Sequence, residues 1–184
     1  MQLTPFEIEG PKLISQALHR DERGFFCERF RRDLFAEAGF AADSFVQDNF
    51  SRSAPGVLRG LHAQHREPQG KLVTCLSGRI FDVAVDLRMG SPTLGRAVTA
   101  VLTGEEPQWL WIPAGFAHGF CVLGDAAADV LYKVDRTYDA GGEIGVVWND
   151  PDLAIEWPIA IAPILSQKDR VLPSFAAYRA DPRF

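Results

Sequence analysis

The chain has 184 residues, of which 47% are hydrophobic and 23% are charged. This length and composition are typical of one soluble globular domain with a sizeable core. The 19 basic and 24 acidic residues give a formal net charge of −5. This balance argues against a nucleic-acid partner, which would need a basic surface, and no apolar run approaches the roughly 20 residues of a membrane span.

The cysteines indicate a reducing compartment. There are three, Cys27, Cys75 and Cys121, far apart in the sequence and each next to an apolar residue. An odd, scattered set does not suggest a disulfide framework. The first twenty residues carry prolines and charges where a signal peptide would have an apolar stretch. We therefore expect a cytoplasmic protein.

Short segments with strand character follow one another along most of the chain, separated by glycine and proline. In chain order they are residues 25–30, 44–51, 57–64, 71–76, 79–87, 97–102, 108–112, 115–123, 129–134 and 144–148. The clearest alternation lies in 79–87, where Phe81, Val83, Val85 and Leu87 face one way. The dipeptide Ser77-Gly78 before this segment predicts a tight hairpin to the preceding strand.

Helical signals are few. Residues 31–38 have apolar side chains at helical spacing and Gly39 as a C-terminal cap, and a second short helix is expected at 174–178. About ten short strands with turns between them predict an all-β antiparallel sandwich or barrel. We expect one domain over 1–184, with the proline-rich tail from about 150 onward wrapping the barrel as loops.

The motif H-A-Q-H, residues 62–65, raises the question of a metal site. Zinc and iron sites in β-barrels combine histidines with a carboxylate. In a regular strand, however, His62 and His65 would point to opposite faces, because side chains alternate. The turn-like residues that follow suggest that His65 has already left the strand. His118 could be counted toward a site, but the spacing is poor, and we expect no metal.

Polar residues inside strands favour an acid–base site. Arg59, His62 and Lys71 lie within thirteen residues of otherwise apolar sequence, and residues 47–49 form a second polar group. Because buried polar groups are costly unless paired, such groups suggest a lined cavity. A histidine base with a pKa near about 6.5 and the phenol of Tyr132 near about 10 would make a workable proton-transfer pair.

Scattered cations could clamp a phosphate or diphosphate. Candidates are Arg23, Arg59 and the K-D-R segment at 168–170. The alternative is that they are solvated surface charges, which is the better interpretation for Arg31 and Arg32 on the predicted helix. For Arg23, which precedes a glycine and an apolar segment, both interpretations stay open.

Nine motifs, in order, resemble the dTDP-4-dehydrorhamnose 3,5-epimerase family. The resemblance runs from about residue 13 to about residue 173, nearly the whole chain, and any one of the motifs alone would be weak. They read D-E-R-G-F-F-C-E-R-F (21–30), Q-D-N-F-S (47–51), G-V-L-R-G-L-H (56–62), Q-G-K-L-V (69–73), G-R-I-F-D-V-A-V-D-L-R (78–88), L-W-I-P-A-G-F-A-H-G-F (110–120), L-Y-K-V (131–134), W-N-D-P (148–151) and S-Q-K-D (166–169).

The resemblance implies a cupin-type jelly roll that forms a homodimer and uses no metal or other cofactor. The implied substrate is dTDP-4-dehydro-6-deoxy-D-xylo-hexose, epimerised at C3 and C5 to dTDP-4-dehydro-L-rhamnose. Among the residues, it implies His62 as general base, Asp169 as the carboxylate that orients it and Tyr132 as general acid. Lys71 would be the cation beside the ketone oxygen.

The resemblance also implies a set of substrate-binding residues. They are Arg23, Glu28, Gln47, Asn49, Arg59, His118, Glu143 and Lys168, with Tyr138 near the base or the diphosphate. The N-terminal segment, about 1–50, would contribute to the dimer, and its Arg23 and Glu28 would reach the partner's site.

Three other functions compete with this one. A 3- or 5-monoepimerase of a deoxysugar antibiotic pathway would share the histidine, lysine and tyrosine. A metal-dependent cupin enzyme would lose activity on chelation. A sugar-binding jelly roll without catalytic activity would be indifferent to replacement of His62 or Tyr132.

Overall fold

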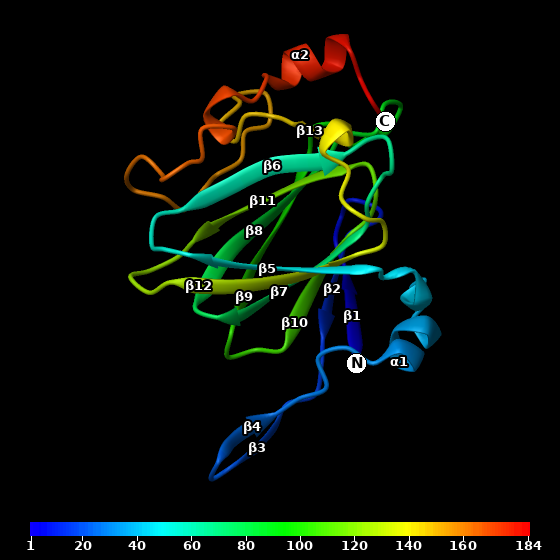
Figure 1. Ribbon diagram of the computed structural model, residues 1–184, viewed down its shortest axis with the longest axis vertical. Helices are drawn as coiled ribbons and strands as arrows, with labels where there is room; N and C mark the ends of the chain where they lie inside the picture. Colours follow the sequence, from blue (N-terminus) through cyan, green and yellow to red (C-terminus); the bar gives the residue numbers. More distant parts are fainter.

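Two antiparallel β-sheets face each other in the computed structural model, which describes residues 1–184 (Figure 1). The six-stranded sheet has the order β1 (Gln2–Pro5), β2 (Lys12–Ser15), β10 (Gln108–Ile112), β7 (Lys71–Ser77), β12 (Ala128–Val134) and β5 (Gln47–Ser53). The five-stranded sheet has the order β13 (Glu143–Gly145), β6 (Leu58–Gln64), β11 (Phe116–Val122), β8 (Arg79–Asp86) and β9 (Ala97–Thr103).

The remaining elements are small. Strands β3 (His19–Asp21) and β4 (Gly24–Phe26) form a separate hairpin, and the α-helices are α1 (Arg32–Glu37) and α2 (Phe175–Ala180). Three 3₁₀ turns are η1 (Ala42–Ser44), η2 (Ala140–Gly142) and η3 (Asp169–Val171). The predicted all-β jelly roll with one or two short helices is confirmed. No helix is long and apolar enough to cross a membrane.

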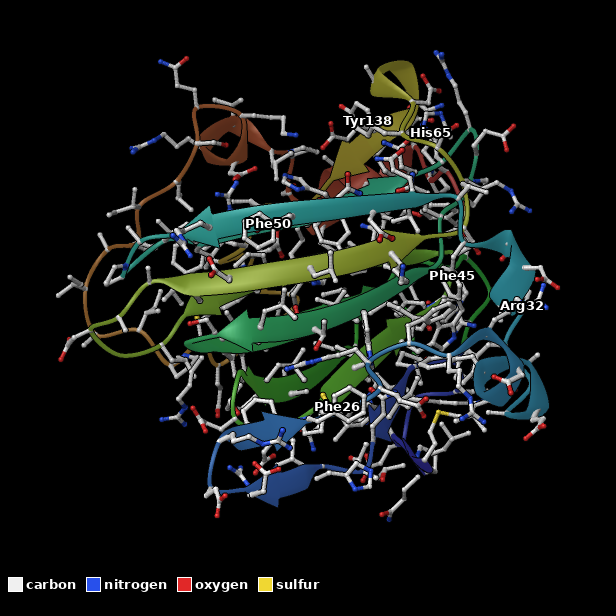
Figure 2. The ribbon with its side chains drawn as sticks, turned by 60° about the horizontal axis from the view of Figure 1, so that its bottom comes forward. Phe26, Arg32, Phe45, Phe50, His65 and Tyr138 are labelled. Carbon is white, nitrogen blue, oxygen red and sulfur yellow. The ribbon has the colours of Figure 1, made fainter.

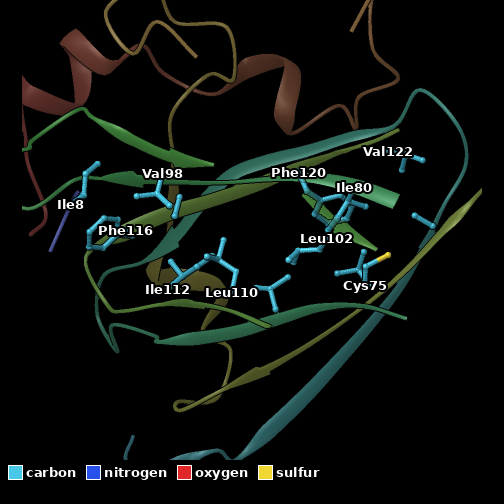
Figure 3. Packing of buried hydrophobic residues seen from close by; sticks show 14 residues of the cluster. Ile8, Cys75, Ile80, Val98, Leu102, Leu110, Ile112, Phe116, Phe120 and Val122 are labelled. Carbon is cyan, nitrogen blue, oxygen red and sulfur yellow. The ribbon is translucent and has the colours of Figure 1, made fainter. Parts of the chain in front are cut away.

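The main core lies between the two sheets. Fourteen buried apolar side chains pack there, among them Ile80, Leu110, Phe116 and Phe120 (Figure 3). Full burial of a side chain of this size stabilises the fold by about 1.5–3 kcal/mol relative to exposure. Ile80 and Ala84 of β8 belong to this core. Their side chains therefore point to the opposite face from Phe81, Val83, Val85 and Leu87, as the predicted alternation requires.

The outer face of the five-stranded sheet is also buried. Val83, Val85 and Leu87 point to this face and pack against a second cluster that includes Leu153 and Phe175 of the C-terminal tail. The tail therefore acts as a third layer over this sheet, as the orange and red segments show in Figure 1. Both faces of β8 are apolar for this reason.

The predicted hairpin at Ser77-Gly78 is wrong. Strand β7 pairs with β10 and β12, whereas β8 pairs with β11 and β9, so the chain changes sheets between them. Gly78 makes this corner with a φ of +75°, and a Cβ there would lie 2.4 Å from the carbonyl oxygen of Ala127. A glycine between two strands signals a sharp turn in both architectures, so the dipeptide could not distinguish them.

The N-terminal region differs most from expectation. The strand predicted at 25–30 ends at Phe26, and strands β1, β2 and β3 were not predicted. Later in the chain, the strand predicted at 144–148 is only Glu143–Gly145. Strand β1 is four residues long, includes Pro5 and lies at the edge of its sheet, the place where proline is tolerated in a sheet. The β3–β4 hairpin projects away from the body of the molecule (Figure 1).

Candidate active site

A cavity of about 410 Å³ opens between the two sheets, with β5 and β12 on one side and β6 and β11 on the other. This size is typical of a small-molecule site. Eleven of the thirteen predicted site residues line it: Gln47, Asn49, Arg59, His62, Lys71, His118, Tyr132, Tyr138, Glu143, Lys168 and Asp169. Arg23 and Glu28 do not.

His62 and Asp169 form a hydrogen-bonded pair. His62 points inward from β6, and its Nε2–H donates to Oδ1 of Asp169 across 2.6 Å. Asp169 is buried and is also held by its main-chain N–H, which donates to Oγ of Ser166. Burial alone would raise the pKa of Asp169, but its interactions with His62 and Ser166 and a main-chain hydrogen bond from Gly60 together outweigh burial and lower that pKa. A carboxylate fixed on Nε2 leaves Nδ1 of His62 to act as a base.

Lys71 lies next to this pair at the start of β7. The residue is only 7% exposed, and Nζ donates to the main-chain carbonyl of His62 at 3.1 Å. Burial lowers the pKa of Lys71 to about 8, although the carboxylates of Glu143 and Asp82 act in the opposite direction. The ammonium is therefore a desolvated cation beside the base.

Tyr132 lines the same cavity from the other sheet. It lies on β12, opposite Asn49 of β5, and its ring is 6.4 Å from that of His118. Burial raises the pKa of Tyr132, so its phenol stays protonated at neutral pH. A base on one sheet and a protonated phenol on the other can reach opposite faces of a bound molecule.

His118 belongs to a second histidine–aspartate pair. Its Nε2–H donates to Oδ1 of Asp82 across 2.5 Å, and both residues are buried. The other oxygen of Asp82, Oδ2, has no hydrogen-bond partner.

Three charged or polar groups meet at one end of the cavity. Glu143 accepts hydrogen bonds from Lys168 Nζ at 2.5 Å and from the Tyr138 hydroxyl at 2.7 Å. Burial opposes ionisation of Glu143, but these two bonds hold its pKa below the ordinary value. The Lys168 side chain is half exposed, so its ammonium can also donate hydrogen bonds to a molecule on the solvent side.

A β-bulge places two cavity residues on the same face. Arg59 and His62 are three residues apart on β6, a spacing that puts side chains on opposite faces of a regular strand. His62 pairs with His118 of β11, but Arg59 pairs with Phe120, so the register shifts between them. The extra residue is Gly60, with a φ of +109° and a backbone too close to His118 for a Cβ. Both side chains therefore face the cavity.

Arg23 and Glu28 lie elsewhere in the chain's own fold. Arg23 is at the tip of the projecting hairpin, with a side chain 85% exposed and paired with Asp21. Glu28 follows the hairpin and pairs with Arg31. Neither can contribute to the cavity of the same chain.

The second histidine of H-A-Q-H is separate from the first. His65 follows the last residue of β6, and its Nδ1 and main-chain N–H both bond to the carbonyl of Gly142. It therefore holds a turn, as predicted. The structure brings no group of three or more His, Cys, Asp or Glu side chains together in a way that could hold a metal ion.

Sequence reasoning missed Asp82, Gln64, Gln69 and Ser51. Asp82 interrupts the inward, apolar side of β8, and that interruption was a usable signal. Gln64 is two residues after His62 on β6, so both side chains lie on the same face of the strand and line the cavity. Gln69 lies in the turn before β7, where the sequence does not indicate which way a side chain points. The Oγ of Ser51 is sealed in the cavity wall without a partner.

The fold and cavity define an acid–base enzyme of the jelly-roll type, in which cations adjoin a paired histidine and a tyrosine. The sequence model of the dTDP-4-dehydrorhamnose 3,5-epimerase family matches residues 5–177. The chain belongs to this family of isomerases, and the predicted family is confirmed.

Individual relatives support the assignment. The dTDP-4-dehydrorhamnose 3,5-epimerase of Pseudomonas aeruginosa is 51% identical over 176 residues, covering 96% of this chain and 97% of that protein. The crystal structure of a Legionella pneumophila 3,5-epimerase in complex with dTDP-4-keto-L-rhamnose is 46% identical with a TM-score of 0.93, covering 100% and 98%. A 3'-monoepimerase from Streptomyces bikiniensis in complex with dTDP-quinovose is 34% identical with a TM-score of 0.90, covering 96% and 89%.

Proposed function

We propose that this chain inverts C3 and C5 of dTDP-4-dehydro-6-deoxy-D-xylo-hexose to give dTDP-4-dehydro-L-rhamnose. The observation that carries the proposal is the placement of His62 and Tyr132 on opposing sheets of one cavity, with Lys71 beside the histidine. The ketone at C4 acidifies the hydrogens on both neighbouring carbons. One carbonyl can therefore serve two inversions, and no oxidant or reductant is required.

Proton removal is assigned to His62. Nδ1 takes the proton from C3 or C5, and the C–H electron pair moves into an enolate whose charge rests on the C4 oxygen. Asp169 does not touch the substrate in this scheme. Through its bond to Nε2 it holds the ring orientation and stabilises the imidazolium that forms, as carboxylates do in histidine-based catalysis.

Lys71 is assigned to the enolate oxygen. Its ammonium is placed in advance in a water-poor site, where a positive charge stabilises a developing oxyanion far more than it would in water. With a pKa of about 8, it is mostly charged at neutral pH.

Inversion requires a proton from the face opposite His62. Tyr132 donates it, becoming a phenolate while His62 carries the abstracted proton. Exchange with solvent then restores both groups before the second inversion. A single residue could only return the proton to the face it came from.

The nucleotide part carries the diphosphate charge, for which Arg59, His118 and Lys168 are the nearby cations and donors. Gln47, Asn49, Tyr138 and Glu143 complete the proposed binding set. We infer that Arg23 and Glu28 act on the cavity of a partner subunit in a homodimer, because the hairpin carries them away from their own cavity. A cytoplasmic location fits the three unpaired cysteines.

Deuterium incorporation tests the reaction. We expect incubation of the enzyme and keto-sugar nucleotide in D₂O to place deuterium at both C3 and C5 of the product, located by NMR. Deuterium at only one of these carbons would replace the proposal with a monoepimerase. No exchange at either would reject epimerisation.

Variants test the roles. His62→Asn and Tyr132→Phe should retain binding of the substrate but lose roughly 10²- to 10⁴-fold in turnover, the range of acid–base catalysis. Asp169→Asn should behave like His62→Asn. His65→Asn is the matched control, since His65 holds a turn outside the cavity, and it should turn over substrate at nearly the wild-type rate. Unchanged turnover in the first two variants would assign the proton transfers to other residues, and the absence of turnover in the wild type would point to a sugar-binding protein without this chemistry.

A further inference from the structure

Two buried glutamines at one end of the cavity each have one bound end and one free end. Gln64 is 5% exposed and Gln69 is 8% exposed, and both line the cavity. The Oε1 of Gln64 accepts from the main-chain N–H of Asp139 at 3.2 Å. The Nε2 of Gln69 donates to the main-chain carbonyl of Arg136 at 2.7 Å.

These bonds determine which way each amide faces. A main-chain N–H can only donate, so the end of Gln64 that meets Asp139 must be its oxygen. A main-chain carbonyl can only accept, so the end of Gln69 that meets Arg136 must be its nitrogen. Gln64 therefore presents an NH₂ donor to the cavity, and Gln69 presents a carbonyl acceptor.

Neither free end has a partner within the protein. No bond from Nε2 of Gln64 or to Oε1 of Gln69 is formed, and neither atom is among the sealed, unpartnered side-chain atoms, which are Ser51 Oγ and Asp82 Oδ2. A buried amide left unpaired costs about 1–3 kcal/mol. The free ends thus remain accessible to solvent in the cavity, and a ligand that displaces this solvent must pair with them.

The position relative to His62 restricts that group. Gln64 is two residues beyond His62 on β6, so their side chains leave the same face about 7 Å apart. A substrate atom that contacts Gln64 is therefore close to the reacting carbons and far from the Arg59 end. One donor and one acceptor together match a hydroxyl group, which both accepts and donates.

We propose that Gln64 and Gln69 bind the C2 hydroxyl of the substrate's hexose. This inference rests on the proposed function. The hexose has free hydroxyls at C2 and C3, and the one at C3 changes its direction when C3 inverts. Two amides fastened to the backbone suit the hydroxyl that stays in place. They hold the ring while C3 and C5 change configuration, and they select sugars that carry oxygen at C2.

The glutamines also fasten the loop at 136–139, so a test must separate the two roles. The experiment compares the natural substrate with its 2-deoxy analogue in wild type, Gln64→Glu and Gln64→Met. Gln64→Glu keeps the acceptor for Asp139 and loses the donor but adds a negative charge, whereas Gln64→Met removes the amide without adding a charge. On the natural substrate we expect kcat/KM to fall roughly 5- to 100-fold in both variants.

On the 2-deoxy analogue, wild type should show a similar fall and the variants no further one. Gln47→Met is the matched control: Gln47 holds the same loop through the N–H of Tyr138, and its other end binds Asn49. Its loss should be equal on both substrates.

Equal losses of the Gln64 variants on both substrates would overturn the proposal, because only the loop would then be affected. Wild-type turnover of the analogue at the natural rate would also overturn it. Failure of the proposed function is distinguishable, since wild type would then exchange no deuterium into the natural substrate.

Discussion

Lys71 shows how one residue combines two opposing demands. A lysine is normally charged far above neutral pH, but burial between the sheets lowers its pKa to about 8. The nearby carboxylates of Glu143 and Asp82 limit the shift and keep the ammonium charged at neutral pH. The result is a cation with little hydration, which is the form that stabilises an oxyanion best.

The pH dependence of the reaction follows from this pKa. Because the protonated lysine is the useful form, kcat/KM should decline as pH rises through about 8. Tyr132 cannot explain such a limb, since burial raises its pKa from an ordinary value near about 10. The measurement is a pH profile of kcat/KM for wild type and Lys71→Arg.

Arginine does not titrate in this range. The Lys71→Arg profile should therefore lack the alkaline limb, even if its overall activity is lower. A limb of unchanged midpoint in that variant would assign the titration to another group.

At the level of elements, the C-terminal tail is what places Asp169. Strand β13 is followed by a segment without strands, and η3 delivers Asp169 to the open edge of the five-stranded sheet. Helix α2 then anchors the tail: Ser174 caps it, and the main-chain N–H of Phe175 donates to Asp150. The Tyr178 hydroxyl donates to the main-chain carbonyl of Leu87 at 2.6 Å.

Removing that hydroxyl tests the anchor. Tyr178→Phe leaves the buried carbonyl of Leu87 without its partner, which should reduce the free energy of unfolding by about 1–3 kcal/mol. The measurement is the urea midpoint at unchanged slope. Tyr138→Phe serves as the control, because its exposed hydroxyl should matter by less than about 0.5 kcal/mol. Equal midpoints for Tyr178→Phe and wild type would contradict the anchoring role.

At the level of the whole molecule, two large aromatic side chains are exposed on the outer side of the six-stranded sheet and on the hairpin. Phe50 on β5 is 60% exposed and Phe26 on the hairpin is 66% exposed. Figure 2 shows both on the side of this sheet that faces the viewer. Exposed apolar side chains of this kind are typical of a subunit interface. They support the proposed dimer, in which the β3–β4 hairpin of each subunit reaches the cavity of its partner.

Mixed dimers test whether the site is shared. Arg23→Ala alone should lower kcat/KM roughly 10- to 100-fold through loss of a charge-assisted contact. His62→Asn alone should be inactive. When the two variants are unfolded together and refolded, half of the dimers should contain both chains, and each of these has one intact site.

Activity should then recover to about a quarter of the wild-type value per chain. The measurement is turnover of the refolded mixture, with each variant refolded alone as control. Activity equal to the mean of the two single variants would show that Arg23 serves its own cavity or none.

Local patterns in the sequence were sufficient to predict most strands, the helix at 31–38 and the family. Strand alternation, turn residues and motif order are recorded in neighbouring residues, so they can be recognised before folding. The polar groups at 47–49, 59–62 and 71 were visible for the same reason, since polar side chains stand out in apolar strands.

Only the tertiary structure decided which of these residues meet. The bulge at Gly60 puts Arg59 on the face of His62 against the regular period, and Gly78 turns an expected hairpin into a crossing between sheets. Asp169 reaches His62 across 107 positions of sequence, and the direction of Gln64 and Gln69 depends on a loop that folds back onto them. These are contacts between distant segments, and their geometry depends on packing, which the order of residues alone does not specify.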